Sequence, residues 1–285
     1  MSGLWAVTGS SGFLGAELCR RLVSHGKRVL RLQRTRAEEG WLRFTLGEPL
    51  PQGALAGVEV LVHCAHDFRP RSAEAIERVN VQGSFRLLEA AREARVPRIV
   101  FVSSVSAYTG CVSLYGRAKL RVEARVAELG GCVLRPGVIY ADTPGGFAGR
   151  LEKLSAWPLL PVFSGGRQPL YLVHRDDVVS GIERAAEREA PPEPLLVAHP
   201  VSVPFREVLS LFARRHGRRV RFVSVPADVA LLALRALERV GLGAGFGSDS
   251  LLGLLHPNPD PKVGDLFGVT PRSFAEWAHS APVSS

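Results

Sequence analysis

The sequence predicts an α/β protein in which helices cover both faces of a doubly wound parallel sheet, with a smaller C-terminal lobe. Short apolar runs that are typical of buried strands alternate with segments whose apolar residues recur every three or four positions, as in helices packed on a sheet. The first of these runs, residues 4–7, is followed by a glycine-rich turn and then by a helical pattern. A chain of 285 residues is long enough for such a sheet and a second lobe.

The glycine-rich turn reads Thr-Gly-Ser-Ser-Gly-Phe-Leu-Gly over residues 8–15. The apolar residues that follow at a spacing of four predict one face of a helix. Bare glycines let the backbone approach a pyrophosphate closely, and the first turn of the helix offers it unpaired N–H groups and the positive end of the dipole. A glycine turn without a ligand is the alternative, but the strand before it and the helix after it favour a dinucleotide. The predicted contacts are Gly9, Ser11, Gly12, Phe13, Leu14 and Gly15.

The end of the second strand, residues 28–34, predicts which dinucleotide binds. An enzyme that prefers NAD usually has an acidic side chain there, about 20 residues past the glycines, to hold the ribose hydroxyls. This chain has Gln33 instead, followed by Arg34 and Arg36. Guanidinium groups bind the 2′-phosphate of NADP, which a carboxylate would repel. We therefore expect NADP, with NAD as the alternative; a role of Arg34 and Arg36 as surface charges only also stays open.

A clear strand over residues 58–65 ends in His63 and Cys64, with His66 and Phe68 just beyond it. Neighbouring side chains of a strand point to opposite faces, so His63 and Cys64 cannot converge on a metal ion, and we predict no metal site. His66 and Phe68 follow the carboxyl end of the strand, which is where open α/β sheets bind ligands. They are therefore candidate substrate contacts.

A tyrosine and a lysine follow a strand that ends in hydroxyl groups. The strand, residues 98–104, ends in Ser103 and Ser104, and Tyr115 and Lys119 come next. Four residues apart, these two side chains share one face of a helix, one turn from each other. The spacing is weak by itself, but it becomes a strong indication downstream of a glycine turn and a strand that ends in serines.

Several motifs along the chain resemble the extended short-chain dehydrogenase/reductase family, of the epimerase/dehydratase type. They are the Gly-x-x-Gly-x-x-Gly turn after Thr8, the apolar-His-x-Ala strand end at His63, Asn-Val-x-Gly at Asn80, the Ser104, Tyr115 and Lys119 set, Arg-Pro-x-x-x-Tyr at Arg135, and apolar-His-x-x-Asp at His174. The resemblance is strong up to Asp177 and loose afterwards. It implies a Rossmann-type sheet. It also implies that Asn80 orients the catalytic region and that His174 and Asp177 anchor the second lobe.

The resemblance implies that Ser104, Tyr115 and Lys119 are the catalytic residues. Tyr115 would exchange a proton with a carbonyl or alcohol oxygen while hydride moves to or from the nicotinamide. Ser104 would hydrogen-bond the same substrate oxygen, and Lys119 would lower the pKa of Tyr115 and bind the nicotinamide ribose. The other cofactor contacts implied are the backbone of Cys64 and Ala65, beside the riboses, and of Pro136 and Val138, at the nicotinamide amide.

Departures from the family pattern narrow the expected chemistry. Tyr115 follows Ser104 by only 11 positions, so the loop between them is short. No Asp-Glu pair follows Ser104, and the family's dehydratases use such acids to eliminate water, so dehydration is disfavoured. Residues 41–57 hold one weak strand, 42–46, and then Glu48 where the family has an Asp near the adenine.

The rest of the chain predicts a sixth strand over residues 131–140 and then a glycine- and proline-rich insertion. We expect a dinucleotide-binding domain of residues 1–142 and 173–190, and a substrate lobe of residues 143–172 and 191–285. The helix predicted over residues 227–240 is unusually apolar. Packing in a core or a dimer is expected for it, and a membrane surface or a hydrophobic substrate is the alternative.

Composition disfavours several other classes of protein. Lys+Arg 36 against Asp+Glu 27 gives a net charge of +9, but the basic residues are scattered singly, so no nucleic acid is expected. The four cysteines form no C-x-x-C pair and predict reduced thiols. The first strand begins almost at Met1 and no uncharged apolar run approaches about 18 residues, so we expect a cytoplasmic protein without a transmembrane segment. Helices over 74–92 and 115–129 are where the family commonly dimerises.

The predicted function is that of an NADP-preferring dehydrogenase or reductase acting on a carbonyl or secondary alcohol of a small molecule. One alternative is an epimerase, such as those of sugar nucleotides, that keeps its cofactor without net redox change. The other is an NADP-binding sensor or assembly protein without turnover, against which the intact Ser104, Tyr115 and Lys119 argue.

Overall fold

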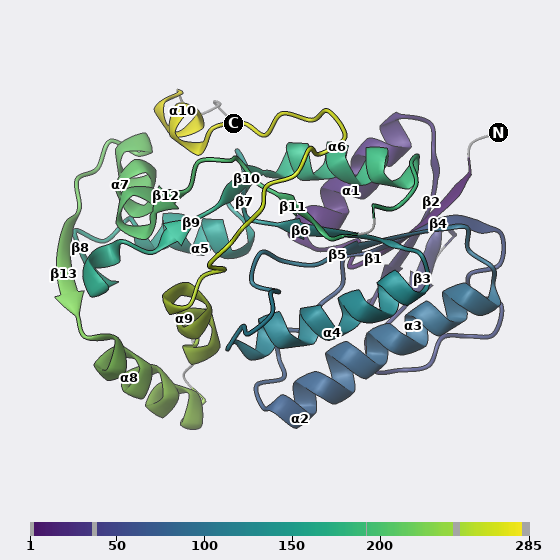
Figure 1. The fold of residues 1–285 in the computed structure, drawn as a ribbon, viewed down its shortest axis with the longest axis horizontal. Coiled ribbons are helices and arrows are strands. Elements are labelled where there is room, and N and C mark those ends of the chain that lie inside the picture. Colours follow the sequence, from purple (N-terminus) through teal and green to yellow (C-terminus); the bar gives the residue numbers. More distant parts are fainter. Residues whose placement is uncertain (1–2, 36–38, 192, 242–245, 281–285) are drawn as a thin grey trace.

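Seven parallel strands form the central sheet of the computed structural model, which describes residues 3–35, 39–191, 193–241 and 246–280 (Figure 1). Their order is β11-β6-β5-β4-β1-β2-β3. The strands are β1 (Leu4–Thr8), β2 (Arg28–Gln33), β3 (Trp41–Arg43), β4 (Val58–His63), β5 (Arg98–Val102), β6 (Cys132–Pro136) and β11 (Leu195–Val197). The strand order reverses between β1 and β4, and ligands of open α/β sheets bind at the carboxyl edge beside such a point.

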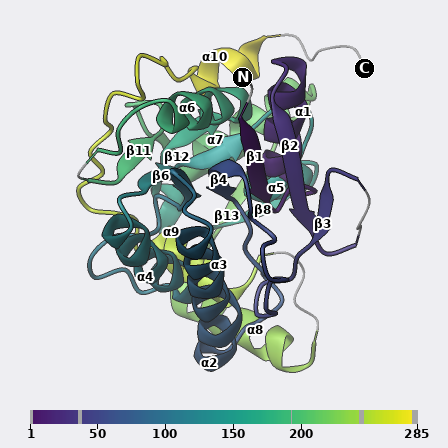
Figure 2. The ribbon, with the colours of Figure 1, turned by 90° about the vertical axis from the view of Figure 1, so that its right-hand side faces the viewer.

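Helices cover both faces of the sheet (Figure 2). One face carries α1 (Phe13–Ser24) and α6 (Arg175–Ala186), and the other carries α2 (Ala73–Ile76), α3 (Gln82–Glu93) and α4 (Leu114–Glu128), with a π-helical turn (Glu77–Val81) between α2 and α3. Side chains alternate along β1: Trp5 and Val7 join the core under α1 and α6, and Ala6 joins the core under α3 and α4. The predicted doubly wound fold is confirmed.

The remaining elements surround a third apolar core, and we call them the second lobe. They are β7 (Val138–Tyr140), α5 (Gly146–Leu154), β8 (Leu159–Phe163), a 3-10 turn (Ser164–Gly166), β9 (Pro169–Leu170), β10 (Leu172–His174), β12 (Val203–Pro204), α7 (Phe205–Arg215), β13 (Arg221–Val225), α8 (Ala227–Arg239), α9 (Ser248–Leu255) and α10 (Phe274–His279). Strand β11 falls within the segment 191–285 predicted for this lobe, but it pairs with β6 and completes the main sheet.

The sixth strand is where the prediction is wrong: residues 131–140 form two strands, β6 and β7, in different sheets. Gly137 lies between them, and its N–H donates to the carbonyl of Val197 at 3.0 Å. A Cβ at Gly137 would lie 2.2 Å from the carbonyl oxygen of Tyr171. The chain therefore leaves the main sheet at the position where another backbone segment approaches too closely for any other residue, and β7 then pairs with β10.

Helix α8 meets the expectation of core packing only in part, because it contacts the core of the second lobe with one face and none of its residues is fully buried. Leu231 and Leu234 are partly buried against the core of the second lobe, whereas Leu232 and Val240 are exposed. The apolar residues of α8 occupy more of its circumference than its neighbours cover. Within the described ranges, no helix combines the length and the apolar character needed to cross a bilayer.

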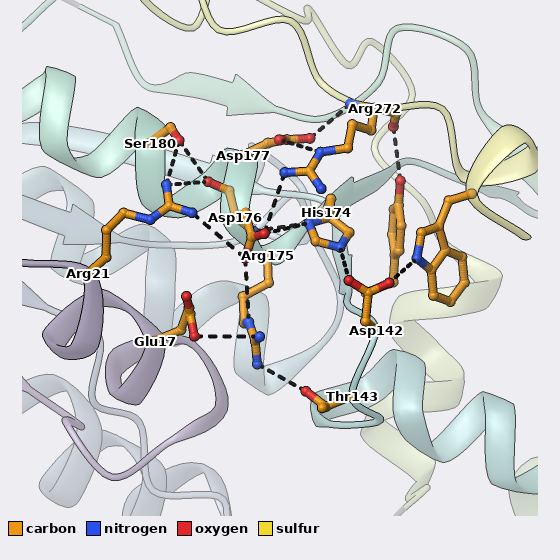
Figure 3. Close-up of polar contacts among 12 residues, drawn as sticks. Glu17, Arg21, Asp142, Thr143, His174, Arg175, Asp176, Asp177, Ser180 and Arg272 are labelled. Atoms are coloured by element: carbon orange, nitrogen blue, oxygen red, sulfur yellow. Dashed lines mark hydrogen bonds and ion pairs between the residues drawn. The ribbon is translucent and has the colours of Figure 1, made fainter. Parts of the chain in front are cut away.

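A polar cluster joins the second lobe to the sheet (Figure 3). The carboxylate of Asp177 accepts hydrogen bonds from the backbone N–H of Arg272 at 2.9 Å and from its Nε at 3.0 Å. The Nδ1 of buried His174 accepts a hydrogen bond from the N–H of Asp176 at 3.2 Å and caps α6. These contacts confirm the structural role expected of His174 and Asp177.

Candidate active site

The glycine turn after β1 forms a backbone cradle. Gly9 has a φ of +66°, a left-handed conformation that favours glycine, and its carbonyl accepts a hydrogen bond from the N–H of Gly12 at 2.8 Å. A Cβ on Gly15 would lie 2.3 Å from that carbonyl oxygen, so only glycine lets α1 start this close to the turn. No side chain caps α1, and its first turn holds no acidic residue, so its first N–H groups can bind an anion. All six predicted contacts lie in this cradle: Gly9, Ser11, Gly12, Phe13, Leu14 and Gly15.

The end of β4 lies directly against this cradle. A Cβ on Gly9 would come within 3.1 Å of the Cα of Ala65. The hydroxyl of Thr8 accepts hydrogen bonds from the backbone N–H groups of Cys64 and Ala65, both at 3.1 Å. Thr8 therefore holds the predicted ribose-contacting segment beside the predicted phosphate-binding turn.

A buried hydrogen-bond chain through His63 supports the same segment, and sequence reasoning missed it. The hydroxyl of Ser84 donates to the carbonyl of Asn80 at 2.6 Å, so it accepts from the Nε2–H of His63 at 2.8 Å. The Nδ1 of His63 then accepts the proton of the Thr8 hydroxyl at 2.7 Å. This arrangement requires a neutral imidazole, and burial lowers the pKa of His63 to about 3. The sequence placed Thr8 and Ser84 on separate elements and offered no sign that they share one histidine.

Asn80 fixes the loop beyond β4. Its Oδ1 accepts a hydrogen bond from the N–H of Asp67 at 2.7 Å, and its Nδ2 donates to the carbonyl of the same residue at 3.0 Å. Asn80 lies in the π-helical turn, which widens the helix where it faces this loop. Asn80 therefore makes the expected backbone hydrogen bonds, and they hold the loop that carries His66 and Phe68.

Ser104, Tyr115 and Lys119 come together at the carboxyl edge of the sheet. The phenol of Tyr115 is hydrogen-bonded to Ser104, whose hydroxyl also accepts from the N–H of Ser106 at 3.2 Å. The Nζ of buried Lys119 donates to the carbonyl of Val102 at 2.8 Å and lies 5.9 Å from the centre of the Tyr115 ring. The three candidate catalytic side chains are thus neighbours, as the spacing predicts.

The expectation that Lys119 lowers the pKa of Tyr115 is wrong for this arrangement. Burial raises the pKa of Tyr115 to about 12, and the hydrogen bond to Ser104 opposes that rise only in part. Burial likewise lowers the pKa of Lys119 to about 8, opposed by the charges of Cys64 and Glu123. The loss of water around a buried phenolate outweighs an ammonium group whose hydrogen bond is directed to the backbone instead of the phenol.

Two aromatic side chains from the loop after β4 cover Tyr115. The ring of His66 meets it edge-on at 4.9 Å, and the ring of Phe68 stacks on it at 5.8 Å. Burial places the pKa of His66 well below its usual value, so the imidazole is neutral at pH 7. His66 and Phe68 therefore lie beside the candidate catalytic tyrosine, where substrate contacts were expected.

The other predicted cofactor contacts lie at the same edge with different accessibility. Gln33 is buried at the end of β2, and Arg34 is exposed just beyond it, close enough to lower the pKa of Asp67. Arg36 lies outside the described residues.

The carbonyl of Pro136 accepts from the N–H of Val105 at 2.9 Å, and the N–H of Val138 donates to the carbonyl of Tyr171 at 2.7 Å. These two groups are therefore already partnered within the chain.

The second lobe contributes a residue that sequence reasoning missed. The carboxylate of Asp249, in the first turn of α9, accepts hydrogen bonds from the N–H groups of Leu114 at 2.6 Å and Tyr115 at 3.0 Å. Ser113 caps the next N–H, that of Gly116, at 3.0 Å. The start of the helix that carries Tyr115 is thereby fixed by a segment distant in sequence, and no local pattern around Asp249 indicates this contact.

Comparison with known proteins shows which family, enzymes and fold the chain resembles. The model of the NAD dependent epimerase/dehydratase family matches residues 5–198. The ceramide reductase of Caulobacter vibrioides is 28% identical over 95% of this chain and 90% of its own length. A 4-hydroxy-2-methyl-3-oxo-4-farnesyl-3,4-dihydroquinoline-1-oxide ketoreductase of Stigmatella aurantiaca is 28% identical over 80% of this chain and 77% of its own. The structure of MoeE5 with UDP-glucose and NAD superposes with a TM-score of 0.68 at 24% identity, covering 79% of this chain and 85% of that one.

Proposed function

The chain belongs to the NAD dependent epimerase/dehydratase family, and from this premise we propose that it is an NADP-preferring reductase that converts a ketone to a secondary alcohol. The observation that carries the proposal is the convergence of three side chains: the phenol of Tyr115 is hydrogen-bonded to Ser104, and the Nζ of Lys119 lies 5.9 Å from the centre of the Tyr115 ring. A protonated phenol is the form that a reduction needs, because the oxygen of the ketone must gain a proton.

The glycine cradle fits a dinucleotide pyrophosphate, since its backbone is bare and the N-terminus of α1 has neither a cap nor an acidic residue. We assign the phosphates to Gly12, Phe13 and Leu14, and the riboses to the segment of Cys64 and Ala65. NADPH, when bound, supplies the hydride that the carbonyl carbon receives.

The preference for NADP rests on the end of β2. The buried Gln33 leaves no carboxylate there to bind ribose hydroxyls, and the exposed guanidinium of Arg34 stands beside it. We propose that Arg34 binds the 2′-phosphate, together with Arg36.

The chain's own residues supply the proton. Because burial keeps the pKa of Tyr115 near 12, its phenol is protonated at pH 7 and donates to the oxygen that becomes the alcohol. Ser104 donates a hydrogen bond to the same oxygen and stabilises its developing negative charge. With a pKa of about 8, Lys119 carries a positive charge at pH 7, and we assign it to the nicotinamide ribose.

For the substrate we propose a ketone that carries a long apolar chain. The two relatives described above are named for the reduction of a ceramide and of a farnesylated quinoline oxide, and both molecules are largely hydrocarbon. Residues 143–172 and the later part of the second lobe would cover this substrate. His66 and Phe68 would flank the reacting carbonyl group of the ketone, because both rings contact Tyr115.

The test is a set of matched short-chain and long-chain ketones incubated with the full chain and NADPH, with the cofactor followed by its absorbance. We expect one NADPH consumed for each alcohol formed, and a higher kcat/KM for the long-chain ketones. Formation of an epimer without net consumption of NADPH would support a cofactor-retaining epimerase instead. NADPH binding without any turnover would support the sensor or assembly role.

A further inference from the structure

Helix α8 presents a continuous apolar surface to solvent. Leu232 is 69% exposed and Val240 is 67% exposed, and smaller or partly exposed apolar residues lie between them on the helix surface. At 100° per residue these side chains span an arc of about 140°. We call this set the α8 stripe: Val229, Leu232, Ala233, Ala236, Leu237 and Val240. Single exposed apolar residues are ordinary, but a contiguous stripe over three turns indicates an interaction surface.

The opposite side of α8 attaches it to the second lobe. Leu231 and Leu234 pack against the apolar core of that lobe. The carboxylate of Glu238 accepts hydrogen bonds from the N–H and the hydroxyl of Ser248, both at 2.7 Å, at the start of α9. The helix is thus held by one face while the residues of the α8 stripe are exposed, and α8 lies at the rim of the molecule (Figure 1).

The charges around the stripe favour an anionic partner. Arg235 and Arg239 line one edge of it, one turn apart, and neither pairs with an acidic group among the described residues. Helix α8 also carries two acidic residues, Asp228 and Glu238, and the carboxylate of Glu238 is already bound to Ser248. In a second copy of the chain the same edge carries the same two arginines, and their repulsion argues against a pair of α8 helices.

Further exposed apolar side chains lie on the strand that precedes α8 and on its partner strand. Strand β13 leads into α8 and pairs with β8. On these strands and just before them, Trp157, Leu159 and Val223 are exposed. Of the eleven large apolar side chains exposed in the described part of the chain, seven lie in this region or on α8. Tryptophan and leucine beside arginine are the composition of helices and loops that lie in the headgroup region of a bilayer.

We propose that α8 is a membrane-surface helix that lies in the interface of an anionic phospholipid bilayer. The α8 stripe enters the acyl boundary, and Arg235 and Arg239 bind lipid phosphates. Burial of the stripe provides binding to any fluid bilayer, and the arginines add the preference for acidic lipids. This docking stands apart from the proposed reaction, since none of these residues contacts Tyr115 or the glycine cradle.

Vesicle flotation of the full chain tests the proposal, with phosphatidylcholine vesicles and with phosphatidylcholine vesicles containing phosphatidylglycerol. We expect binding to the acidic vesicles that weakens as salt is added. The double variant Leu232→Gln/Val240→Gln should lose about tenfold or more in partition coefficient on both kinds of vesicle. The double variant Arg235→Gln/Arg239→Gln should lose about tenfold on the acidic vesicles and little on the neutral ones.

Matched controls separate docking from unfolding and from cofactor binding. Val23→Gln/Val201→Gln removes two exposed valines elsewhere and should bind vesicles like the parent chain. Every variant should retain the thermal midpoint and the NADPH affinity of the parent, which keeps this test independent of the proposed reaction. Absence of binding to acidic vesicles, or binding that the stripe variant leaves unchanged, overturns the proposal. Self-association of the parent that Leu232→Gln/Val240→Gln abolishes, without vesicle binding, would assign the stripe to a second copy.

Discussion

The carboxylate of Asp249 accepts a hydrogen bond from the backbone N–H of Tyr115 at 3.0 Å, although the two residues lie 134 positions apart. The same carboxylate accepts from the N–H of Leu114 at 2.6 Å, so one side chain of the second lobe caps the helix that carries the candidate acid. The lobe that would cover the substrate therefore also positions the residue that would protonate it.

Replacing Asp249 should impair the positioning of Tyr115 more than it weakens cofactor binding. We expect Asp249→Ala to lower kcat up to about tenfold, because the N–H groups of Leu114 and Tyr115 lose their acceptor, a contact of the kind typically worth about 1 kcal/mol. Asp249→Asn retains one oxygen acceptor and should recover part of the rate. Steady-state kinetics measure both effects, with Asp260→Ala as control, since Asp260 is exposed and pairs with Lys262. An unchanged kcat in Asp249→Ala would contradict the positioning role.

Tyr115→Phe removes the proposed proton donor and leaves the ring contacts with His66 and Phe68 in place. The reduction rate should fall by about 10²–10⁴, and the Kd for NADPH should stay within a few-fold of the parent value. Single-turnover absorbance and a fluorescence titration give the two quantities. The matched control is Tyr108→Phe, because the hydroxyl of Tyr108 donates to the backbone carbonyl of His256 and has no part in the proposed proton transfer. A Tyr115→Phe variant with the full rate would exclude Tyr115 as the acid.

The rate of reduction should depend on the charge of Lys119. Its pKa is lowered to about 8, so the ammonium is present below that pH and is lost as the pH rises through it. The kcat/KM should therefore decline above pH about 8. The carboxylate of Glu123 raises the pKa of Lys119, so Glu123→Gln should move the decline to lower pH. A kcat/KM that stays constant up to pH 10, or a decline whose pH is the same in Glu123→Gln, would show that the charge of Lys119 does not control the reaction.

Cofactor preference should depend on Arg34. We expect the parent chain to bind NADPH more tightly than NADH, and Arg34→Ala to weaken NADPH binding about tenfold while NADH binding changes little. Fluorescence titrations with both cofactors measure this difference. Arg43→Ala, which removes another exposed arginine at this side of the sheet, is the control. Equal affinities of the parent for the two cofactors would refute the assignment to NADP.

His63 should make the fold sensitive to acid. Its pKa is about 3 in the folded chain against 6.5 when unfolded, so the unfolded chain takes up the proton first and stability is lost as the pH falls from 6.5 toward 3. Between pH 7 and 4.5 this group alone contributes a loss of about 3 kcal/mol. In chemical denaturation, His63→Asn should start from a lower stability at pH 7 but lose less over that interval. His256→Asn, at an exposed position, should lose as much as the parent.

The amino-acid sequence by itself determined the elements whose signals are local. The strand, glycine turn and helix over the first 24 residues follow from bare glycines and a helical repeat, which depend on near neighbours in the chain. The same holds for Tyr115 and Lys119, since a spacing of four places two side chains on one helix face wherever the helix lies. Their order after the strand that leads to Ser104 also predicted that the three would meet, because parallel strands and the following helices share one edge of the sheet.

Tertiary structure alone decided the contacts between distant segments. The cap that Asp249 places on the helix of Tyr115 and the hydrogen bonds that Thr8 and Ser84 share through His63 each depend on how two elements pack. The pKa of Tyr115 was predicted with the wrong sign because an ammonium group nearby can be inferred from spacing, whereas the extent of burial cannot. The exposed face of α8 could not be predicted for the same reason. An apolar helix is buried only where other elements pack against it, and local sequence does not tell which elements do so.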